Sequence, residues 1–327
     1  MPEPPYYLWD HWYLAGRSSE VKASRAHGVT IMETRLVLYR QASGEVVALR
    51  DRCPHLGASL ALGRVKGDCL ACPFHGWTFD SRGTCVDIPA LGDPTPRLRG
   101  LTIPRYHVRE AAGLIWVFMT RRPDLVPTSD PVPPELLDPT WAWGLVEDVW
   151  PTNYTRFVEN MLDMGHLPYV HARTIGRLSR PRGPLEPTIT EQPGGFDIAG
   201  GQLEFRLPNV HRLRISEAMG MYMWGVPTGP EETKIYILGL RRFARARLLK
   251  PLFNWMNRRI LNEDRRIIES QEPKHVTFGP GGDLLMRPDS AAKAYRKLLA
   301  RALDASPFGN DPTLPVTEGR ESDRSES

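Results

Sequence analysis

Short apolar runs separated by turn signals occupy the first third of the chain. The runs cover residues 36–39, 46–49, 77–79, 85–88 and 114–118, and they are rich in β-branched and aromatic residues. Ala42-Ser43-Gly44 and Ser81-Arg82-Gly83 lie between them and are typical of hairpin turns. This pattern predicts a small all-β domain.

The second half alternates longer β-prone runs with helical periodicity. Strands are expected at 141–150, 196–207, 212–224 and 234–243, and helices at about 251–271 and 290–303. We therefore predict an α+β chain: an all-β domain at 1–122, a Pro-rich linker at 123–140, an antiparallel sheet with helices at 141–305, and a disordered tail at 306–327.

The length of the chain agrees with two domains. Its net charge excludes few classes of function. The 327 residues carry 42 basic and 38 acidic side chains, an excess too small to indicate a nucleic-acid partner. The longest apolar run, 111–119, falls short of the roughly 20 residues that span a bilayer. The N-terminus lacks the pattern of a signal peptide, so we expect a cytoplasmic protein without a membrane partner.

Two short motifs in the first domain combine thiols with imidazoles. They are Cys53-Pro-His55 and Cys72-Pro-Phe-His75, in loops between predicted strands. Two thiolates suit one iron of a [2Fe-2S] cluster and two imidazoles the other, although the same four donors would also satisfy a tetrahedral zinc ion. The spacing, followed by Gly76-Trp77, resembles the Rieske signature. We expect Cys69 and Cys85 to be buried thiols.

Basic residues flank both motifs, at Arg50, Arg52, Arg64 and Lys66. They are interpreted either as a solvated surface or as a docking site for an acidic ferredoxin or a reductase.

A second candidate metal site lies in the stretch from residue 159 to 171. Glu159, Asp163 and His166 have the spacing of one helix face, and Gly165 and Pro168 then end the helix, so that His171 can turn back beside His166. Two imidazoles suit a divalent iron or zinc, with a carboxylate supplied from elsewhere. Glu263 and Asp264 in the later helix are candidates, or else they pair with neighbouring arginines.

Together these motifs resemble the oxygenase component of Rieske non-haem iron oxygenases over nearly the whole chain. The residues Pro288-Asp-Ser-Ala-Ala-Lys-Ala-Tyr-Arg-Lys resemble the branch that includes vanillate-type and dicamba-type O-demethylases. The resemblance implies that Cys53, His55, Cys72 and His75 hold a [2Fe-2S] cluster. It further implies that His166, His171 and Asp264 hold Fe(II), with Glu263 as the reserve ligand.

The family resemblance also implies roles for two further carboxylates. Asp163 would carry electrons between the cluster of one subunit and the iron of the next, in a head-to-tail homotrimer. Glu159 either polarises the iron site or only pairs with Arg156.

The function implied is that of a terminal oxygenase. It would use O2, and electrons from NAD(P)H passed on by a flavin reductase or ferredoxin, to hydroxylate or oxidatively demethylate an aromatic or polycyclic small molecule. Aromatic cis-dihydroxylation is the alternative among oxygenases; a Rieske electron carrier or a zinc-stabilised binding protein is the alternative from another class. Iron content separates these classes.

The substrate pocket is expected among the strands of the second domain. One run there is apolar and rich in flexible methionines: Met219, Met221, Tyr222, Met223 and Trp224. Because alternate members of a strand point to opposite faces, at most half of them can face a substrate. Two further features, His211 and a basic run, are interpreted either as a carboxylate-binding group or as a solvated face. The basic run consists of Arg241, Arg242, Arg245 and Arg247.

Overall fold

The computed structural model describes residues 5–92, 100–178, 186–279 and 281–306. These described residues form three antiparallel sheets and four α-helices, and the predicted α+β fold class is confirmed. The predicted tail lies, apart from Ser306, outside the described residues. No described helix has both the length and the apolar character needed to cross a membrane.

The first sheet has six strands, which include the predicted runs at 36–39, 46–49 and 114–118. Its order is β1 (His11–Arg17), β10 (Leu114–Met119), β9 (Arg105–Ala111), β4 (Val46–Arg50), β3 (Thr34–Arg40) and β2 (His27–Ile31). All six residues of β10 are buried, so this strand lies at the centre of the first core.

A second, four-stranded sheet carries the two loops with the Cys and His motifs. Its strands are β5 (Arg64–Lys66), β6 (Cys69–Ala71), β7 (Thr78–Phe79) and β8 (Cys85–Asp87). They pack with β3 and β4 of the first sheet around a small core that includes Cys53, Cys72 and Cys85. Cys69 is only half-buried, unlike the other three thiols.

The third sheet has seven strands and is covered by helices on one face. Its order is β11 (Ala142–Trp150), β17 (Glu232–Arg241), β16 (Met219–Gly229), β15 (Val210–Ser216), β14 (Leu203–Arg206), β13 (Gly195–Ile198) and β12 (Ile189–Gln192). The helices are α1 (Tyr154–Leu162), α2 (Leu167–Val170), α3 (Lys250–Ile268) and α4 (Ser290–Asp304). Short 3₁₀ turns occur at Ser18–Glu20, Leu60–Leu62, Pro89–Leu91, Pro134–Leu136, Ile175–Leu178, Arg247–Leu249 and Arg287–Asp289.

The two faces of the seven-stranded sheet bury different cores. Tyr222, Trp224 and Tyr236 belong to the same cluster as Tyr13 and other residues of the six-stranded sheet. Met223, Ile235 and Ile237 belong to a cluster with the helices. Because neighbouring residues of a strand point to opposite faces, each of the central strands contributes to both cores.

The N-terminal segment crosses from the first unit to the second. Tyr6 and Leu8 are buried with the helices, and Tyr154 donates a hydrogen bond to the Tyr6 carbonyl at 2.6 Å. Tyr236 in turn donates to the Ala15 carbonyl at 3.1 Å. The two units are therefore joined by shared packing as well as by the linker.

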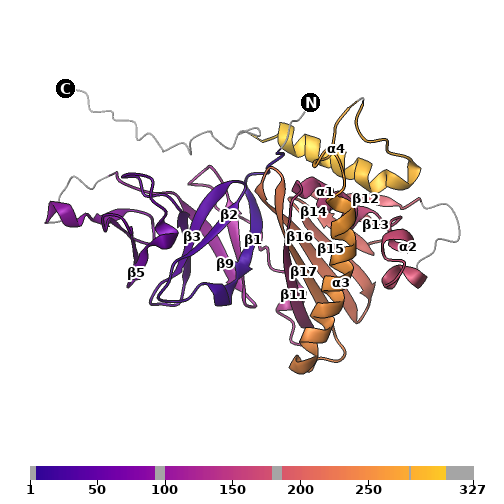
Figure 1. Cartoon of the computed structure of the whole chain (residues 1–327), viewed down its shortest axis with the longest axis horizontal. Coiled ribbons are helices and arrows are strands. Elements are labelled where there is room, and N and C mark those ends of the chain that lie inside the picture. The colour runs from indigo at the N-terminus through magenta and orange to yellow at the C-terminus, as the bar shows by residue number, and fades with distance from the viewer. Residues whose placement is uncertain (1–4, 93–99, 179–185, 280, 307–327) are drawn as a thin grey trace.

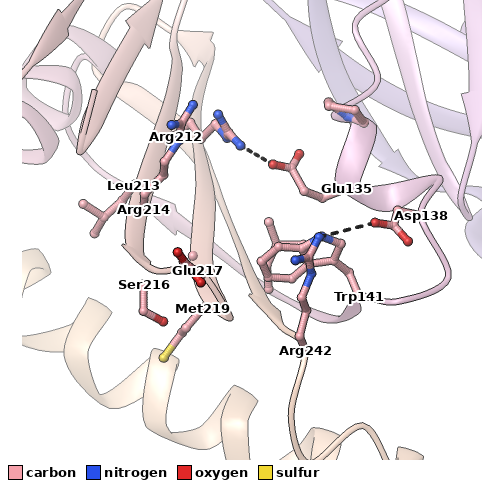
Figure 2. Close-up of a pocket in the computed structure, with 13 residues that line it drawn as sticks. Glu135, Asp138, Trp141, Arg212, Leu213, Arg214, Ser216, Glu217, Met219 and Arg242 are labelled. Carbon is pink, nitrogen blue, oxygen red and sulfur yellow. Dashed lines mark hydrogen bonds and ion pairs between the residues drawn. The ribbon is translucent and has the colours of Figure 1, made fainter. Parts of the chain in front are cut away.

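The predicted linker at 123–140 contains one 3₁₀ turn, Pro134–Leu136, and packs against the seven-stranded sheet. Figure 2 shows Glu135 facing Arg212 and Asp138 facing Arg242 on either side of a cavity of about 670 Å³. Tyr222 donates to the same Glu135 carboxylate at 3.0 Å. These contacts fix the linker on the face that also meets the six-stranded sheet.

The helix that begins after Pro151 is shorter than predicted. Asn153 caps its start by accepting from the Thr155 backbone N–H at 3.0 Å, but the helix ends at Leu162, with Asp163 as its C-cap. Glu159, Asp163 and His166 therefore do not share one helix face, and that prediction is wrong. Gly165 and Pro168 do follow the break, and Pro168 lies in the first turn of α2.

Two buried arginines and two partly buried carboxylates tie α1, Asp283 and α4 together. Arg296 donates to both oxygens of Glu159, at 2.6 and 3.0 Å, and to Asp283 at 2.8 Å. Arg156 makes a two-point contact with Asp283 and also donates to the Pro273 carbonyl. Burial would raise the pKa of Asp283, but Arg156 and Arg296 lower it to about 2.

We predict that Arg296→Met destabilises the protein by about 3 kcal/mol, because it leaves two partly buried carboxylates, Glu159 and Asp283, with one guanidinium. The measurement is the free energy of unfolding in urea, followed by circular dichroism. The control is Arg109→Met, which removes a pair with Asp130 whose side chains are 42% and 53% exposed, and which should cost about 1 kcal/mol or less. Equal effects of the two variants would contradict the prediction.

Candidate metal centres

The two Cys and His motifs lie in matching loops at the edge of the four-stranded sheet. Gly57 N donates to the Cys53 carbonyl at 2.9 Å, and Gly76 N donates to the Cys72 carbonyl at 3.1 Å. Both glycines have positive φ, +75° and +76°, a conformation that side chains with a Cβ rarely adopt. Each loop thus folds back at a glycine four residues after its cysteine.

The four motif side chains form an inner pair and an outer pair. Cys53 and Cys72 are buried and their thiols interact, whereas His55 and His75 are exposed with ring centroids 4.8 Å apart. The His55 ring stacks on Trp77 at 4.8 Å. Burial raises the pKa of the Cys53 thiol to about 11, so a bound metal is needed to hold it as a thiolate.

This arrangement fits a group with two metal ions that have different ligands better than it fits one zinc ion. Among the described residues, only His166, His171 and Asp264 bring three donor atoms close enough together for a single ion. The four motif residues are instead divided into a thiol side and an imidazole side, as the mixed ligation of a [2Fe-2S] cluster requires.

The second centre brings together residues from α2 and α3. His166 comes directly before α2 and His171 directly after it, while Asp264 lies on the buried side of α3. Asp264 Oδ1 lies 3.5 Å from His166 Nε2 and 3.1 Å from His171 Nε2, and the three donor atoms are within 4.8 Å of one another. The expected triad is therefore assembled.

The chemistry of this triad fits a divalent cation. Asp264 Oδ1 is buried without a hydrogen-bond partner among the described residues, and Asp264 is only 4% exposed. Burial lowers the pKa of His171, but Asp264 and Glu263 outweigh it and raise that pKa above its ordinary value. A cation between these groups would take the place of that proton. Two imidazoles and one carboxylate suit non-haem Fe(II).

Glu263 approaches His171 from the side opposite Asp264. With its proton on Nδ1, His171 donates to Glu263 Oε2 at 2.8 Å, and Thr174 donates to the same oxygen at 2.6 Å. This leaves His171 Nε2 unprotonated and directed at Asp264, the arrangement that a metal ligand needs. Glu263 thus supports a candidate ligand and does not take its place.

Asp163 lies next to the site but toward solvent. Its Oδ2 is 3.5 Å from His166 Nδ1, its Oδ1 accepts from the Gly165 N–H at 2.6 Å, and its side chain is 43% exposed. Glu159 points elsewhere, into the charge cluster with Arg296 and Arg156.

An apolar cavity adjoins Asp264. Its volume is about 50 Å³, and its lining residues are Met161, Met221, Met223, Ile237, Asn257, Ile260, Leu261 and Asp264. Of the predicted Met-rich run, only Met221 and Met223 line it. Tyr222 and Trp224 point to the opposite core, and Met219 lines the larger cavity beside the linker. The expected alternation of the strand is therefore confirmed.

The residues suggested for carboxylate recognition lie away from this cavity. His211 is buried among Phe157 and Phe205, and burial lowers its pKa to about 4. Arg241 stacks on Phe253 and Arg242 on Trp141. None of the three is among the described residues that line the cavity.

Sequence reasoning missed Thr174 and Asn257. Nothing in the sequence distinguishes Thr174 from other polar residues near a helix end. The position of Asn257 could have been predicted, because it lies seven residues before Asp264, which places both residues on one face of a helix.

Comparison with known proteins found a family match in each of the two units. Residues 11–106 match the Rieske [2Fe-2S] domain, and residues 150–199 match the vanillate O-demethylase oxygenase C-terminal domain. The toluene-4-sulfonate monooxygenase system iron-sulfur subunit TsaM1 of Comamonas testosteroni is 32% identical over 63% of this chain and 59% of its own. The 5,5'-dehydrodivanillate O-demethylase oxygenase subunit of a Sphingobium strain is 33% identical over 54% of this chain and 42% of its own. The chain thus spans about half the length of these two relatives.

A solved structure resembles the whole chain. NdmA of Pseudomonas putida, a methylxanthine N1-demethylase, matches with a TM-score of 0.77 and 25% identity over 92% of both chains. The matched domains occur in the order expected for an oxygenase component, and the fold agrees along almost the full length. The chain thus carries a Rieske [2Fe-2S] domain followed by a vanillate O-demethylase-type oxygenase C-terminal domain, and its fold is similar to that of NdmA.

Proposed function

We propose that this protein is the terminal oxygenase of a Rieske-type system and hydroxylates or oxidatively demethylates an aromatic or polycyclic small molecule. The observation that carries the proposal is the triad of His166, His171 and Asp264 beside an apolar cavity. The relatives named as a monooxygenase subunit and as demethylases support the reaction class.

In this proposal Cys53, Cys72, His55 and His75 hold a [2Fe-2S] cluster, and the triad holds Fe(II). A cluster held by the first four residues would supply single electrons, and Fe(II) held by the triad would supply the chemistry for substrate oxidation with O2. The apolar side chains around Asp264 keep water away from this reaction. A separate flavin reductase or ferredoxin, driven by NAD(P)H, supplies the electrons.

The arrangement of the two sites supports the proposal that electrons pass between subunits. Figure 1 places the small sheet with β5 at one end of the molecule and α2 at the opposite end. A head-to-tail homotrimer would bring the exposed His55 and His75 of one chain to the exposed Asp163 of the next. Leu56 and Phe74, which are 64% and 60% exposed beside these histidines, would be covered by such a contact.

Metal content tests the two sites together. We expect about three irons and two acid-labile sulfides per chain, and a Rieske-type electron paramagnetic resonance signal after reduction. His166→Ala should lower the iron content to about two per chain and leave the sulfide and the signal unchanged. Zinc without sulfide in the purified protein would refute the proposal.

Asp163 is expected to carry electrons without binding metal. Asp163→Asn should keep the full iron and sulfide content but reduce substrate oxidation by tenfold or more, because the anionic link between the histidines is lost. The measurement is single-turnover oxidation of the reduced cluster in the presence of O2. Asp130→Asn changes an exposed carboxylate outside both sites and serves as the control. Unchanged cluster oxidation in Asp163→Asn would contradict this role.

Glu263 is expected to position His171. Glu263→Ala should weaken Fe(II) binding by about 10- to 100-fold, since the tautomer and ring orientation of His171 are no longer fixed. The measurement is anaerobic equilibrium dialysis, with the visible spectrum of the cluster as a check on folding. Glu269→Ala, near the end of the same helix, removes a carboxylate that pairs with Arg265 and is the matched control. Equal Fe(II) affinity in the two variants would rule out the positioning role.

A further inference from the structure

One buried carboxylate beside the Cys53 loop is held by neutral donors. Asp51 is 4% exposed and lies directly after β4, two residues before Cys53. The Ser59 hydroxyl lies 2.9 and 2.7 Å from its two carboxylate oxygens, and the Ala61 N–H donates to Oδ1 at 2.8 Å. Arg35 donates only to the main-chain carbonyl of Asp51, at 3.3 Å. The carboxylate is therefore hydrogen-bonded, but it forms no ion pair with any residue that the structure describes.

The arginines nearest to Asp51 in the sequence contact other groups or water. Arg50 donates a hydrogen bond to the Tyr106 hydroxyl. The side chains of Arg35 and Arg52 are exposed, so water and salt screen their charges. A buried charge is screened much less. The negative charge of Asp51 is therefore offset only weakly by these neighbours.

The donors to Asp51 belong to the segment that connects the Cys53 loop with the Cys72 loop. This segment contains the 3₁₀ turn Leu60–Leu62 and then passes directly against β6, because a Cβ at Gly63 would lie only 2.3 Å from the Ala71 carbonyl oxygen. Ala71 immediately precedes Cys72. The carboxylate therefore fixes the segment that links the two buried cysteines.

The Cys72 loop has no carboxylate in the matching place. The two loops are closed alike, because Cys53 N donates to the Ala58 carbonyl at 2.9 Å and Cys72 N donates to the Trp77 carbonyl at 2.8 Å. The residue two positions before Cys72 is Leu70, which is fully buried. A carboxylate is thus not needed to fold a loop of this kind, and its presence at one loop calls for another explanation.

A negative charge held in this core opposes the reduction of a [2Fe-2S] cluster. With two thiolate and two neutral imidazole ligands, the oxidised cluster has no net charge. One electron reduces one of its irons from Fe(III) to Fe(II) and gives the cluster a single negative charge. A nearby anion raises the free energy of that reduced form, and it does so more strongly in a protein core than in water. The reduction potential falls as a result, and the reduced cluster becomes a stronger electron donor.

We propose that Asp51 is a positioning residue for the cluster: its carboxylate fixes the segment between the two cysteines, and its buried charge lowers the reduction potential. The inference rests on the proposed function, in which the four motif residues hold a [2Fe-2S] cluster. It adds a residue that binds no metal and that favours electron transfer from the cluster to the mononuclear iron.

Two substitutions that change different parts of this arrangement test the proposal. Asp51→Asn keeps the size of the side chain and one acceptor oxygen but removes the charge, whereas Ser59→Ala keeps the charge and removes a hydrogen bond. The potential is measured by anaerobic titration with redox mediators, followed by the electron paramagnetic resonance of the reduced cluster. We expect Asp51→Asn to raise the potential by about 59 mV or more, which is tenfold in the equilibrium constant of a one-electron reduction. Ser59→Ala should leave the potential unchanged or lower it.

A purely structural role would give a different result. Water that enters a loosened loop stabilises the charged, reduced cluster, so the potential would then rise in both variants. The control is Asp80→Asn. Asp80 also accepts from backbone N–H groups in a turn after β7, but it pairs with Arg82, and its substitution should leave the equilibrium constant within twofold. An equal rise in Asp51→Asn and Ser59→Ala, or no rise in Asp51→Asn, would overturn the proposal.

Asp51→Glu covers the case in which Asp51→Asn does not retain the cluster. Because this variant keeps the charge, we expect it to hold the cluster with an equilibrium constant within twofold of that of the unaltered protein. Loss of its cluster, or a potential raised as in Asp51→Asn, would also overturn the proposal. Iron and sulfide are assayed on the same samples. Absence of sulfide from the unaltered protein would refute the proposed function, whereas a complete cluster that does not respond to Asp51→Asn would refute only the role of Asp51.

Discussion

The constraint on which the structure depends is the burial of both faces of β16 and β17. Tyr222, Trp224 and Tyr236 face the six-stranded sheet, while Met223 and Ile237 face the helices. A shift of either strand by one residue would exchange these two sets. The same register that joins the two units therefore also places the methionines beside Asp264.

The chemistry of the sites was readable from the sequence because each site is built from short local motifs. Cys53-Pro-His55 and Cys72-Pro-Phe-His75 each lie in a single loop, and only four residues separate His166 from His171. Strands with strong apolar runs, such as β4 and β10, were also predicted to within about two residues. The domain boundaries and the roles of the site residues stay predictions.

Features that depend on tertiary contacts were not readable in this way. Helical periodicity continues past Leu162, yet α1 ends there, because the chain must turn for His166 and His171 to meet Asp264. Neighbouring residues on a helix point about 100° apart, which is why Glu263 and Asp264 approach His171 from different sides. Sequence alone left the two as competing ligands. Burial of Glu159 beside Arg296 likewise depends on α4, more than 120 residues later.

The shared core has a consequence for evolution and engineering. The six-stranded sheet and the seven-stranded sheet bury their aromatic residues against each other. Tyr6 and Leu8 extend from the first unit into the core of the second. A foreign cluster-bearing unit grafted onto residues 141–305 would have to reproduce the surface that covers Tyr222, Trp224 and Tyr236. Chimeras built by cutting at the linker would expose large aromatic side chains to water and aggregate. The chain is therefore inherited, and should be redesigned, as one piece.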